Sequence, residues 1–265
     1  DAEGLKQIGS VMMKLSMLGP QVVDQHPDQV LTSAEQRVLP ILRQYRGTEG
    51  WDQLLTFLRA KALTERYHMD PGFMLRLMEK FGPLDWRHPA THAIYWSALG
   101  IHRATLQRDL GPGDPINTDR QVIHGLQMLF NNGRIEFTLN GMTLLPDLRF
   151  IEAYEKAQFG ARQRERARSA GEGTITSFKT GHKNFLEEAV EKCYLYGDEQ
   201  RAQKYYQKVR DKYAERARDA YRQPIPEFVA QRMQSELSQD RETTSAFVSM
   251  MIRRGLRQGL AQNDP

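Results

Sequence analysis

Apolar residues recur three or four positions apart along most of the chain. The spacing is clear in residues 5–18, 51–63, 73–81 and 119–130, and each run lies near a glycine, a proline or a residue that caps helices. A repeat of about 3.6 residues gathers such side chains on one face of a helix. The pattern therefore predicts an all-α protein made of amphipathic helices.

Residues at the expected helix ends support these bounds. Ser33 stands three positions before Gln36, a spacing typical of a capping box. Pro40 follows within the same apolar run, so we expect the helix to kink or restart there. Thr48 can cap the next helix, and Asp70 precedes a proline that suits the first position of another.

One segment departs from the helical pattern. Residues 134–145, "RIEFTLNGMTLL", place two short β-prone arms around Asn140-Gly141, a pair typical of type I′ turns. This predicts one small β-hairpin insertion. Beyond it, the apolar spacing predicts further helices near 183–196, 199–215, 226–238 and 243–261.

The chain is long enough for one large domain or two smaller ones, with 265 residues. Residues 160–173, "GARQRERARSAGEG", alternate arginine with other residues and then become glycine-rich. We expect a basic flexible joint over 161–175. It would separate an N-terminal helical region with the hairpin, residues 1–160, from a C-terminal helical region, residues 176–265. The alternative is one continuous solenoid.

Residues 184–213, "NFLEEAVEKCYLYGDEQRAQKYYQKVRDKY", predict two helices joined at a glycine. A small residue early in the second helix lets the pair approach, and an aromatic residue four positions later fills the space where the helices diverge. The segment resembles a tetratricopeptide repeat and is TPR-like at Leu186, Ala189, Val190, Gly197, Ala202 and Tyr206. The resemblance implies a solenoid-like stack of helical hairpins that binds protein partners.

A weaker similarity occurs earlier in the chain. Trp96, Leu99 and Gly100 reproduce the W-x-x-L-G spacing of the first helix of such a repeat. Gly125 and Leu129 could supply the small and large positions of its second helix, after an insertion. Together the two segments are similar to uncharacterised bacterial proteins with degenerate repeats.

The run "DWRHPATHAIYWSALGIHRA" at 85–104 offers the main alternative chemistry. His88 and His92 have the spacing of two zinc ligands on one helix face, which would suit a metal-dependent enzyme. Pro89 stands where such a hydrolase carries its glutamate base. The packing interpretation is favoured: Asp85 caps a helix, the histidines are cap or polar-face residues, and the packed stripe is Ala93, Trp96 and Gly100.

Charge points to a second candidate region. The formal net charge is +4, and its excess lies in residues 151–265, which carry 21 basic and 17 acidic side chains. Tyrosine and arginine are enriched at binding hot spots, so we expect a surface for a protein partner, in particular an acidic one. Its candidate residues are Arg162, Arg164, Arg166, Arg168, Tyr194, Tyr196 and Tyr205.

The same arginines could instead contact nucleic acid or another anionic surface. Glu165 and Glu172 dilute their charge, and the run lacks aromatic residues that would stack on bases, so we place this function behind protein binding.

Several other classes find no support. Cys193 is the sole cysteine, which excludes an internal disulfide and a multi-thiolate zinc site. No nucleophile elbow or phosphate loop occurs, so we expect no enzyme and no cofactor. No apolar run approaches the roughly 20 residues that span a bilayer.

Because the chain begins at Asp1 and shows no signal peptide, we interpret it as a soluble piece of a longer protein. Its location would be the cytoplasm, or the cell envelope through a segment outside this chain. The sequence as a whole predicts a non-catalytic protein–protein interaction or scaffold module.

Overall fold

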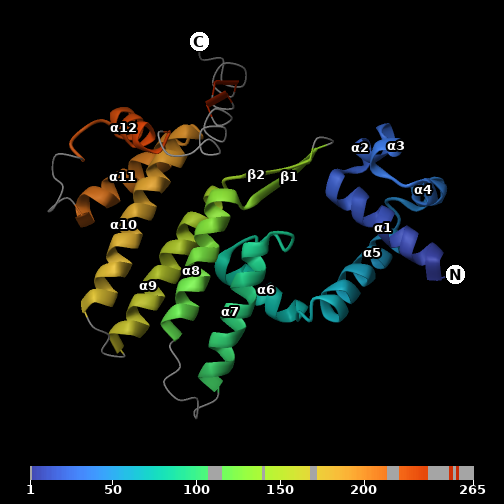
Figure 1. The fold of residues 1–265 in the computed structure, drawn as a ribbon, viewed down its shortest axis with the longest axis horizontal. Coiled ribbons are helices and arrows are strands. Elements are labelled where there is room, and N and C mark those ends of the chain that lie inside the picture. The colour runs from blue at the N-terminus through green and yellow to red at the C-terminus, as the bar shows by residue number, and fades with distance from the viewer. Residues whose placement is uncertain are drawn as a thin grey trace. The chain divides into compact units, whose positions relative to one another are not determined.

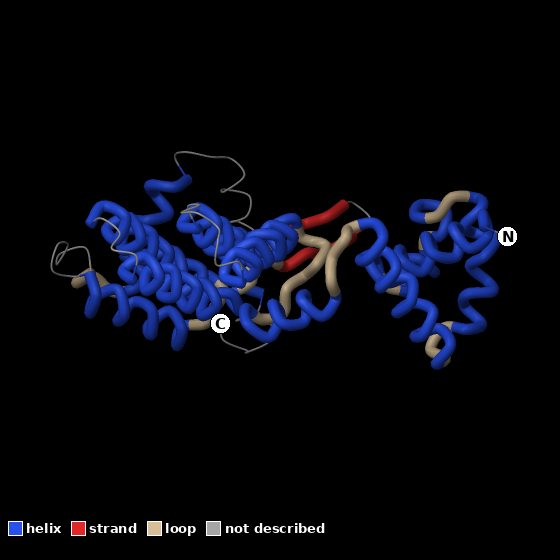
Figure 2. Tube along the Cα trace, turned by 90° about the horizontal axis from the view of Figure 1, so that it is seen from below, coloured by secondary structure: helices blue, strands red, loops and turns tan. Residues whose placement is uncertain are grey.

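The computed structural model describes residues 2–106, 115–138, 141–167, 172–213, 221–237, 251–252 and 255–256. Figure 1 labels their helices and strands, and Figure 2 shows the strands as one short pair among helices. The predicted all-α fold with a small β-hairpin is confirmed. None of the described helices is long and apolar enough to cross a membrane.

The chain divides into two compact units. The first contains residues 1–83 and 135–144, and the second contains residues 84–134 and 145–265. The boundary expected at 161–175 differs from this division. Residues 161–167 continue a helix whose Ala161 and Glu165, four positions apart, are both buried, and another helix begins at Glu172. Residues 168–171 lie outside the described residues.

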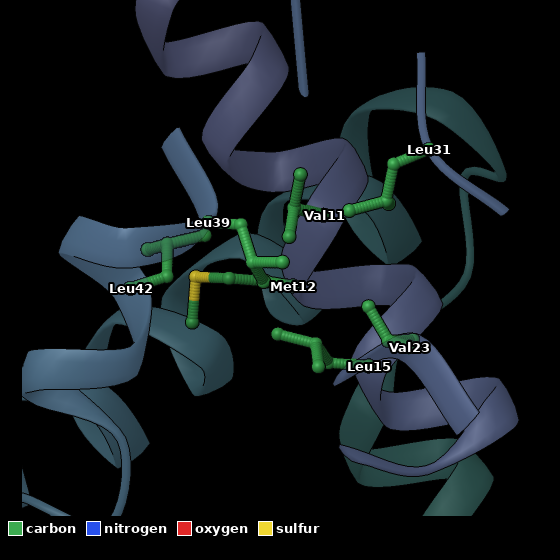
Figure 3. Packing of buried hydrophobic residues seen from close by; sticks show 7 residues of the cluster. All are labelled: Val11, Met12, Leu15, Val23, Leu31, Leu39 and Leu42. Carbon is green, nitrogen blue, oxygen red and sulfur yellow. The ribbon is translucent and has the colours of Figure 1, made fainter. Parts of the chain in front are cut away.

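The first unit has an aliphatic core between its first four helices. Its elements are α1 (Ala2–Leu18), α2 (Pro20–Gln25), α3 (Pro27–Val30), α4 (Ser33–Tyr45), α5 (Glu49–Lys61), a π-helical turn (Ala62–Arg66) and α6 (Pro71–Phe81). Helix α1 packs against α2 and α4. Figure 3 shows the buried cluster that these helices share: Val11, Met12, Leu15, Val23, Leu31, Leu39 and Leu42.

A capping box begins α4, one residue earlier than predicted. The Thr32 hydroxyl accepts a hydrogen bond from the Glu35 amide (3.3 Å), and the Glu35 carboxylate accepts one from the Thr32 amide (2.7 Å). The prediction of Ser33 with Gln36 is therefore wrong. Glu35 also accepts hydrogen bonds from Ser10 and Lys14 of α1, at 2.5 and 2.7 Å, which favours this register.

Other predicted helix ends are confirmed. Thr48 caps α5, and the carboxylate of Asp70 accepts hydrogen bonds from two amides in the first turn of α6. Gly82 ends α6 with a φ of 99°, a conformation that favours glycine. Pro40 lies within α4 without ending it.

The hairpin joins β1 (Arg134–Thr138) and β2 (Gly141–Leu145) in a two-stranded sheet. Residues 139–140, at the predicted turn, lie outside the described part of the chain. The remaining elements are α7 (Pro89–Leu106), α8 (Pro115–Asn132), a 3-10 turn (Leu148–Phe150), α9 (Ile151–Ala167), α10 (Glu172–Leu195), α11 (Glu199–Tyr213) and α12 (Ile225–Leu237).

Helices α7 and α8 approach closely at Gly125. A Cβ added there would lie 2.6 Å from Ile94 Cγ1 and 3.2 Å from the Ala90 carbonyl oxygen, so only glycine fits without movement. The small position proposed for Gly125 is thus a real close contact. The stripe predicted on α7 is wrong, however, because its three residues, Ala93, Trp96 and Gly100, are exposed. The buried face carries Ala90, Thr91, Ile94 and Tyr95.

Successive helices of the second unit pack side by side. Figure 1 shows α8, α9, α10 and α11 in that order, and α12 contacts both α10 and α11. The predicted helical hairpin at 184–213 is confirmed as α10 and α11. Gly197 makes its turn with a φ of 75°, and Ala202 is fully buried. The relationship to tetratricopeptide repeats stays a prediction.

Candidate binding surface

The candidate arginines on α9 have different environments. Arg164 donates two hydrogen bonds to the buried carboxylate of Asp119 on α8, from Nε (3.0 Å) and Nη2 (2.6 Å). This bidentate pair ties α9 to α8, so Arg164 is engaged within the protein. Arg166 is exposed and Arg162 is half-buried. Arg168 lies outside the described residues.

The candidate tyrosines also differ. Tyr205 is 1% exposed, and burial raises the pKa of its hydroxyl, with the charges of Glu155 and Glu152 adding to the effect. Its assignment to a partner surface is wrong, because its side chain fills the interior between helices. Tyr194 and Tyr196 are half-buried near the end of α10.

The structure does not bring the arginines and the remaining tyrosines together. Tyr154 of α9 stacks on Phe185 of α10 with ring centroids 3.5 Å apart, and Gln158 lies opposite Gly181, so the helices are antiparallel. The end of α10 therefore lies beside the start of α9. By this register Arg162 lies opposite position 177 of α10, about 17 residues of helix, or roughly 26 Å, from Tyr194.

Ion pairs instead align α9 with α11. Glu152 pairs with Lys204 (3.4 Å), and one turn later Glu155 pairs with Lys208 (2.5 Å). Both helices advance in the same direction, because each step of three or four residues on one matches a step on the other. One turn further, the register places Phe159 and Arg162 beside the end of α11.

A chain of hydrogen bonds links α9, α10 and α11 near the end of α11. His182 of α10 has its Nε2 3.1 Å from Oε1 of Glu155 on α9. Its Nδ1 lies 2.6 Å from the hydroxyl of Tyr213 on α11. His182 is buried, whereas Tyr213 is half-buried and reaches the surface.

The charges around the chain decide its protonation. Burial by itself would raise the pKa of Glu155, but hydrogen bonds from His182 and Lys208 outweigh it and hold that pKa below its usual value. Burial raises the pKa of Tyr213, although the positive charge of Arg162 opposes this shift. At neutral pH, Glu155 is therefore a carboxylate and Tyr213 keeps its proton.

These states fix the hydrogen-bond directions when the imidazole is neutral. The Nε2–H of His182 donates to Glu155, which has no proton to give, and the Tyr213 hydroxyl donates to Nδ1. Carboxylate, imidazole and hydroxyl stand in the order used by hydrolytic triads. The hydroxyl here is a tyrosine phenol, whose pKa burial raises.

The exposed surface above the chain, here called the basic end, consists of Phe159, Arg162, Arg166 and Lys212. Phe159 is 61% exposed, and Arg166 and Lys212 are also exposed. Within the described ranges, Arg162, Arg166 and Lys212 form no ion pair. The Arg162 Nε is buried and finds no hydrogen-bond acceptor there.

A second buried cluster is fully compensated. Glu187 accepts a hydrogen bond from the Tyr221 hydroxyl and pairs with Lys183 (3.0 Å) and Arg232 (3.3 Å). Arg232 also pairs with Glu191, at 3.1 Å. Each carboxylate has a cation beside it, so this cluster joins α10 to α12 and leaves no charge for a ligand.

The histidines at the start of α7 make local hydrogen bonds. His88 Nδ1 accepts a hydrogen bond from the Ala90 amide (3.1 Å), and His92 Nε2 lies 2.8 Å from the Trp86 carbonyl oxygen. Burial lowers the pKa of His88. In the described part of the chain, no three His, Cys, Asp or Glu side chains are placed to share a metal ion.

Sequence reasoning missed His182 and its partners, although one signal was available. His182 occupies the inward face of α10, four residues after Phe178 and three before Phe185, both buried. An imidazole at a core position requires hydrogen-bond partners from neighbouring helices. That signal predicts a buried polar contact, but it does not name Glu155 or Tyr213.

No protein-family model matches this chain, and neither does any curated protein or solved structure.

Proposed function

We propose that the chain is a non-catalytic protein-binding module, a scaffold component of a larger assembly, and that its basic end recognises an acidic segment of a partner protein. The observation that carries the proposal is the combination of a widely exposed phenylalanine with three cations that lack ion-pair partners among the described residues. An apolar anchor inside a cationic rim suits a peptide that alternates acidic and apolar side chains.

The layer beneath supports this use. Asp119 fixes Arg164, and the less exposed Glu155–Lys208 pair holds α9 to α11, so the backbone that carries the basic end is braced before any partner arrives. A braced surface loses little conformational entropy on binding. The TPR-like α10–α11 hairpin adds a second argument, because the family that it resembles binds proteins.

The test uses the full chain and three probes at equal ionic strength. A fluorescent acidic peptide with a central leucine represents the partner, and a DNA duplex and vesicles with anionic lipid represent the alternative surfaces. We expect the peptide to bind most tightly. Arg166→Glu with Lys212→Glu should weaken peptide binding at least tenfold, because both side chains are exposed and their charges are reversed.

The matched control is Lys6→Glu with Arg37→Glu, which makes the same charge change at exposed positions of the first unit. It should leave peptide affinity within about twofold, since neither position belongs to the basic end. Equal losses in both double variants would contradict the proposed site. Tighter binding of the duplex or the vesicles, lost in the Arg166 and Lys212 variant, would establish the anionic-surface alternative instead.

A further inference from the structure

The chain Glu155–His182–Tyr213 ends at the basic end, where the Tyr213 hydroxyl lies within the electrostatic reach of Arg162. With a neutral imidazole, that hydroxyl donates its proton to His182 Nδ1. A hydroxyl used in this way can offer only its lone pairs to a ligand. It cannot then donate to an anion held by the arginine.

Proton uptake by His182 reverses this arrangement. Both ring nitrogens of an imidazolium donate, so Nδ1–H points to the Tyr213 oxygen while Nε2–H stays on Glu155. The phenolic proton must then turn to another acceptor. Arg162 has donors only, so the acceptor has to come from outside these side chains, and the new positive charge on the ring attracts an anion.

The groups that face His182 permit this change. Glu155 of α9 and Tyr213 of α11 contact it directly. Lys208 of α11 pairs with the same Glu155 oxygen, and the charge of Arg162 on α9 acts on Tyr213. On α10 itself, Lys179 and Lys183 lie within one turn, and Lys183 is engaged by Glu187. Glu155 is the carboxylate that compensates a charged ring, because the remaining neighbours are cations or neutral phenols.

We propose that the Tyr213 hydroxyl and the Arg162 guanidinium form a seat for one oxyanion, and that the anion binds together with one proton taken up by His182. The proposal rests on the proposed function, for which it names the recognised group: a carboxylate or phosphoryl group of the acidic partner. The balance is simple, since one anion and one proton enter, no covalent bond changes, and the phenolic O–H turns its hydrogen bond from His182 to the anion.

The seat also accounts for an otherwise unexplained donor. Arg162 Nε is buried without an acceptor among the described residues, a condition that is uncommon and costly in native proteins. A bound oxyanion supplies the missing acceptor type. Arg162 is in addition the candidate arginine whose charge reaches Tyr213, while Arg164 is held by Asp119.

The experiment is a calorimetric titration of the full chain with sodium sulfate at pH 6, 7 and 8 and constant ionic strength. Sulfate is chosen because its charge does not change over this range, and acetate serves as the carboxylate arm. Repeating each titration in two buffers of different ionisation enthalpy counts the protons. We expect sulfate binding to take up protons, at most one per sulfate, and the affinity to rise as the pH falls, by at most tenfold per pH unit.

Tyr213→Phe should remove most of the proton uptake and weaken sulfate binding, and Arg162→Gln should weaken it about tenfold while the residual uptake persists. Tyr45→Phe, at an exposed tyrosine of the first unit, is the control and should change neither quantity. Sulfate binding without proton uptake, or uptake unchanged in Tyr213→Phe, would overturn the proposal. Tighter sulfate than acetate would assign a phosphoryl group, and the reverse a carboxylate.

Nitrogen NMR of His182 gives a readout that does not require a variant. In the free protein at pH 8, Nδ1 should be unprotonated and Nε2 protonated, and saturating sulfate at pH 6 should protonate both. If the protonation of the His182 ring nitrogens does not change when sulfate is added, the proposed seat is wrong.

The seat and the proposed function can fail separately. If Arg166→Glu with Lys212→Glu abolishes peptide binding while sulfate binding takes up no proton, the proposed function stands and the seat fails. Proton-linked sulfate binding without peptide binding supports the seat and contradicts the proposed function.

Discussion

The two units of the chain bury different kinds of side chain. The core of the first unit, in its first four helices, is aliphatic apart from Met12, and Glu35 is its buried charged residue among those described. Hydrogen bonds from α1 and from its own capping box lower the pKa of Glu35 to about 2, even though burial opposes the shift. The second unit buries several ionisable groups: His88, Asp119, Asp147, Glu165, His182, Glu187 and Glu191.

This contrast indicates where a site can be built. Aliphatic contacts are non-directional and stabilise in proportion to the area buried, so they leave helix rotation loosely specified. Hydrogen-bonded charges require particular partners at particular distances. In the second unit these requirements fix the register of α9, α10 and α11, and the Glu155–His182–Tyr213 chain depends on that register.

The strongest effect that we expect concerns the aliphatic core of the first unit. Leu39 of α4 is 3% exposed. Leu39→Ala should therefore lower the free energy of unfolding by about 3 kcal/mol, because burial is lost and a cavity remains. Hydrogen exchange followed by mass spectrometry reports this loss separately for peptides of each unit.

Ile41 provides the control on the same helix. It is 57% exposed, so Ile41→Ala should change the stability of these peptides by less than about 0.5 kcal/mol. Equal effects at Leu39 and Ile41 would show that the inward face of α4 is not the one described.

The next effect concerns the buried charges of the second unit. Glu187→Ala removes the carboxylate shared by Tyr221, Lys183 and Arg232, and should cost about 2 kcal/mol because a buried hydroxyl and a partly buried cation lose their partner. Exchange protection should fall in α10 and α12.

Glu152→Ala removes an ion pair of the same type whose two side chains are 65% and 56% exposed. It should cost less than about 0.5 kcal/mol, because solvent screens exposed pairs. If the two glutamate variants lose similar stability, burial does not distinguish the charges of the second unit, and the contrast between the units collapses.

Local patterns were sufficient to predict much of the fold. Apolar spacing located α1, α6 and the α10–α11 hairpin, and Asp70 and Thr48 marked helix ends because capping depends on residues only two or three positions away. The hairpin at 134–145 was also local. The capping box of α4 was misplaced by one residue because its choice depends on Ser10 and Lys14 of another helix.

The candidate site was harder to predict, because its contacts are distant in sequence. His182 lies 27 residues from Glu155 and 31 from Tyr213, and no spacing rule links them. Of the predicted site residues, Arg162 and Arg166 lie on the basic end, whereas Arg164 and Tyr205 are engaged or buried within the protein. A count of arginines and tyrosines does not reveal which of them will pair with a buried carboxylate or be buried against a neighbouring helix.

The weakest effect concerns the face of α7, where Gly100 was predicted to pack and is open instead. Gly125→Ala should destabilise the second unit by about 1 kcal/mol, because the clash with Ile94 exceeds what alanine gains in helix propensity.

Gly100→Ala meets no atom within 4 Å and Gly9→Ala, in α1, meets only Leu58 at 4.0 Å, so both should stabilise their helices by up to about 1 kcal/mol. Opposite signs at Gly125 and at these two glycines would show that α7 and α8 approach closely at Gly125, while Gly9 and Gly100 have room for a side chain. A loss at Gly100 similar to that at Gly125 would restore the Trp96–Gly100 face as the packed one and, with it, the repeat-like arrangement that its spacing first indicated.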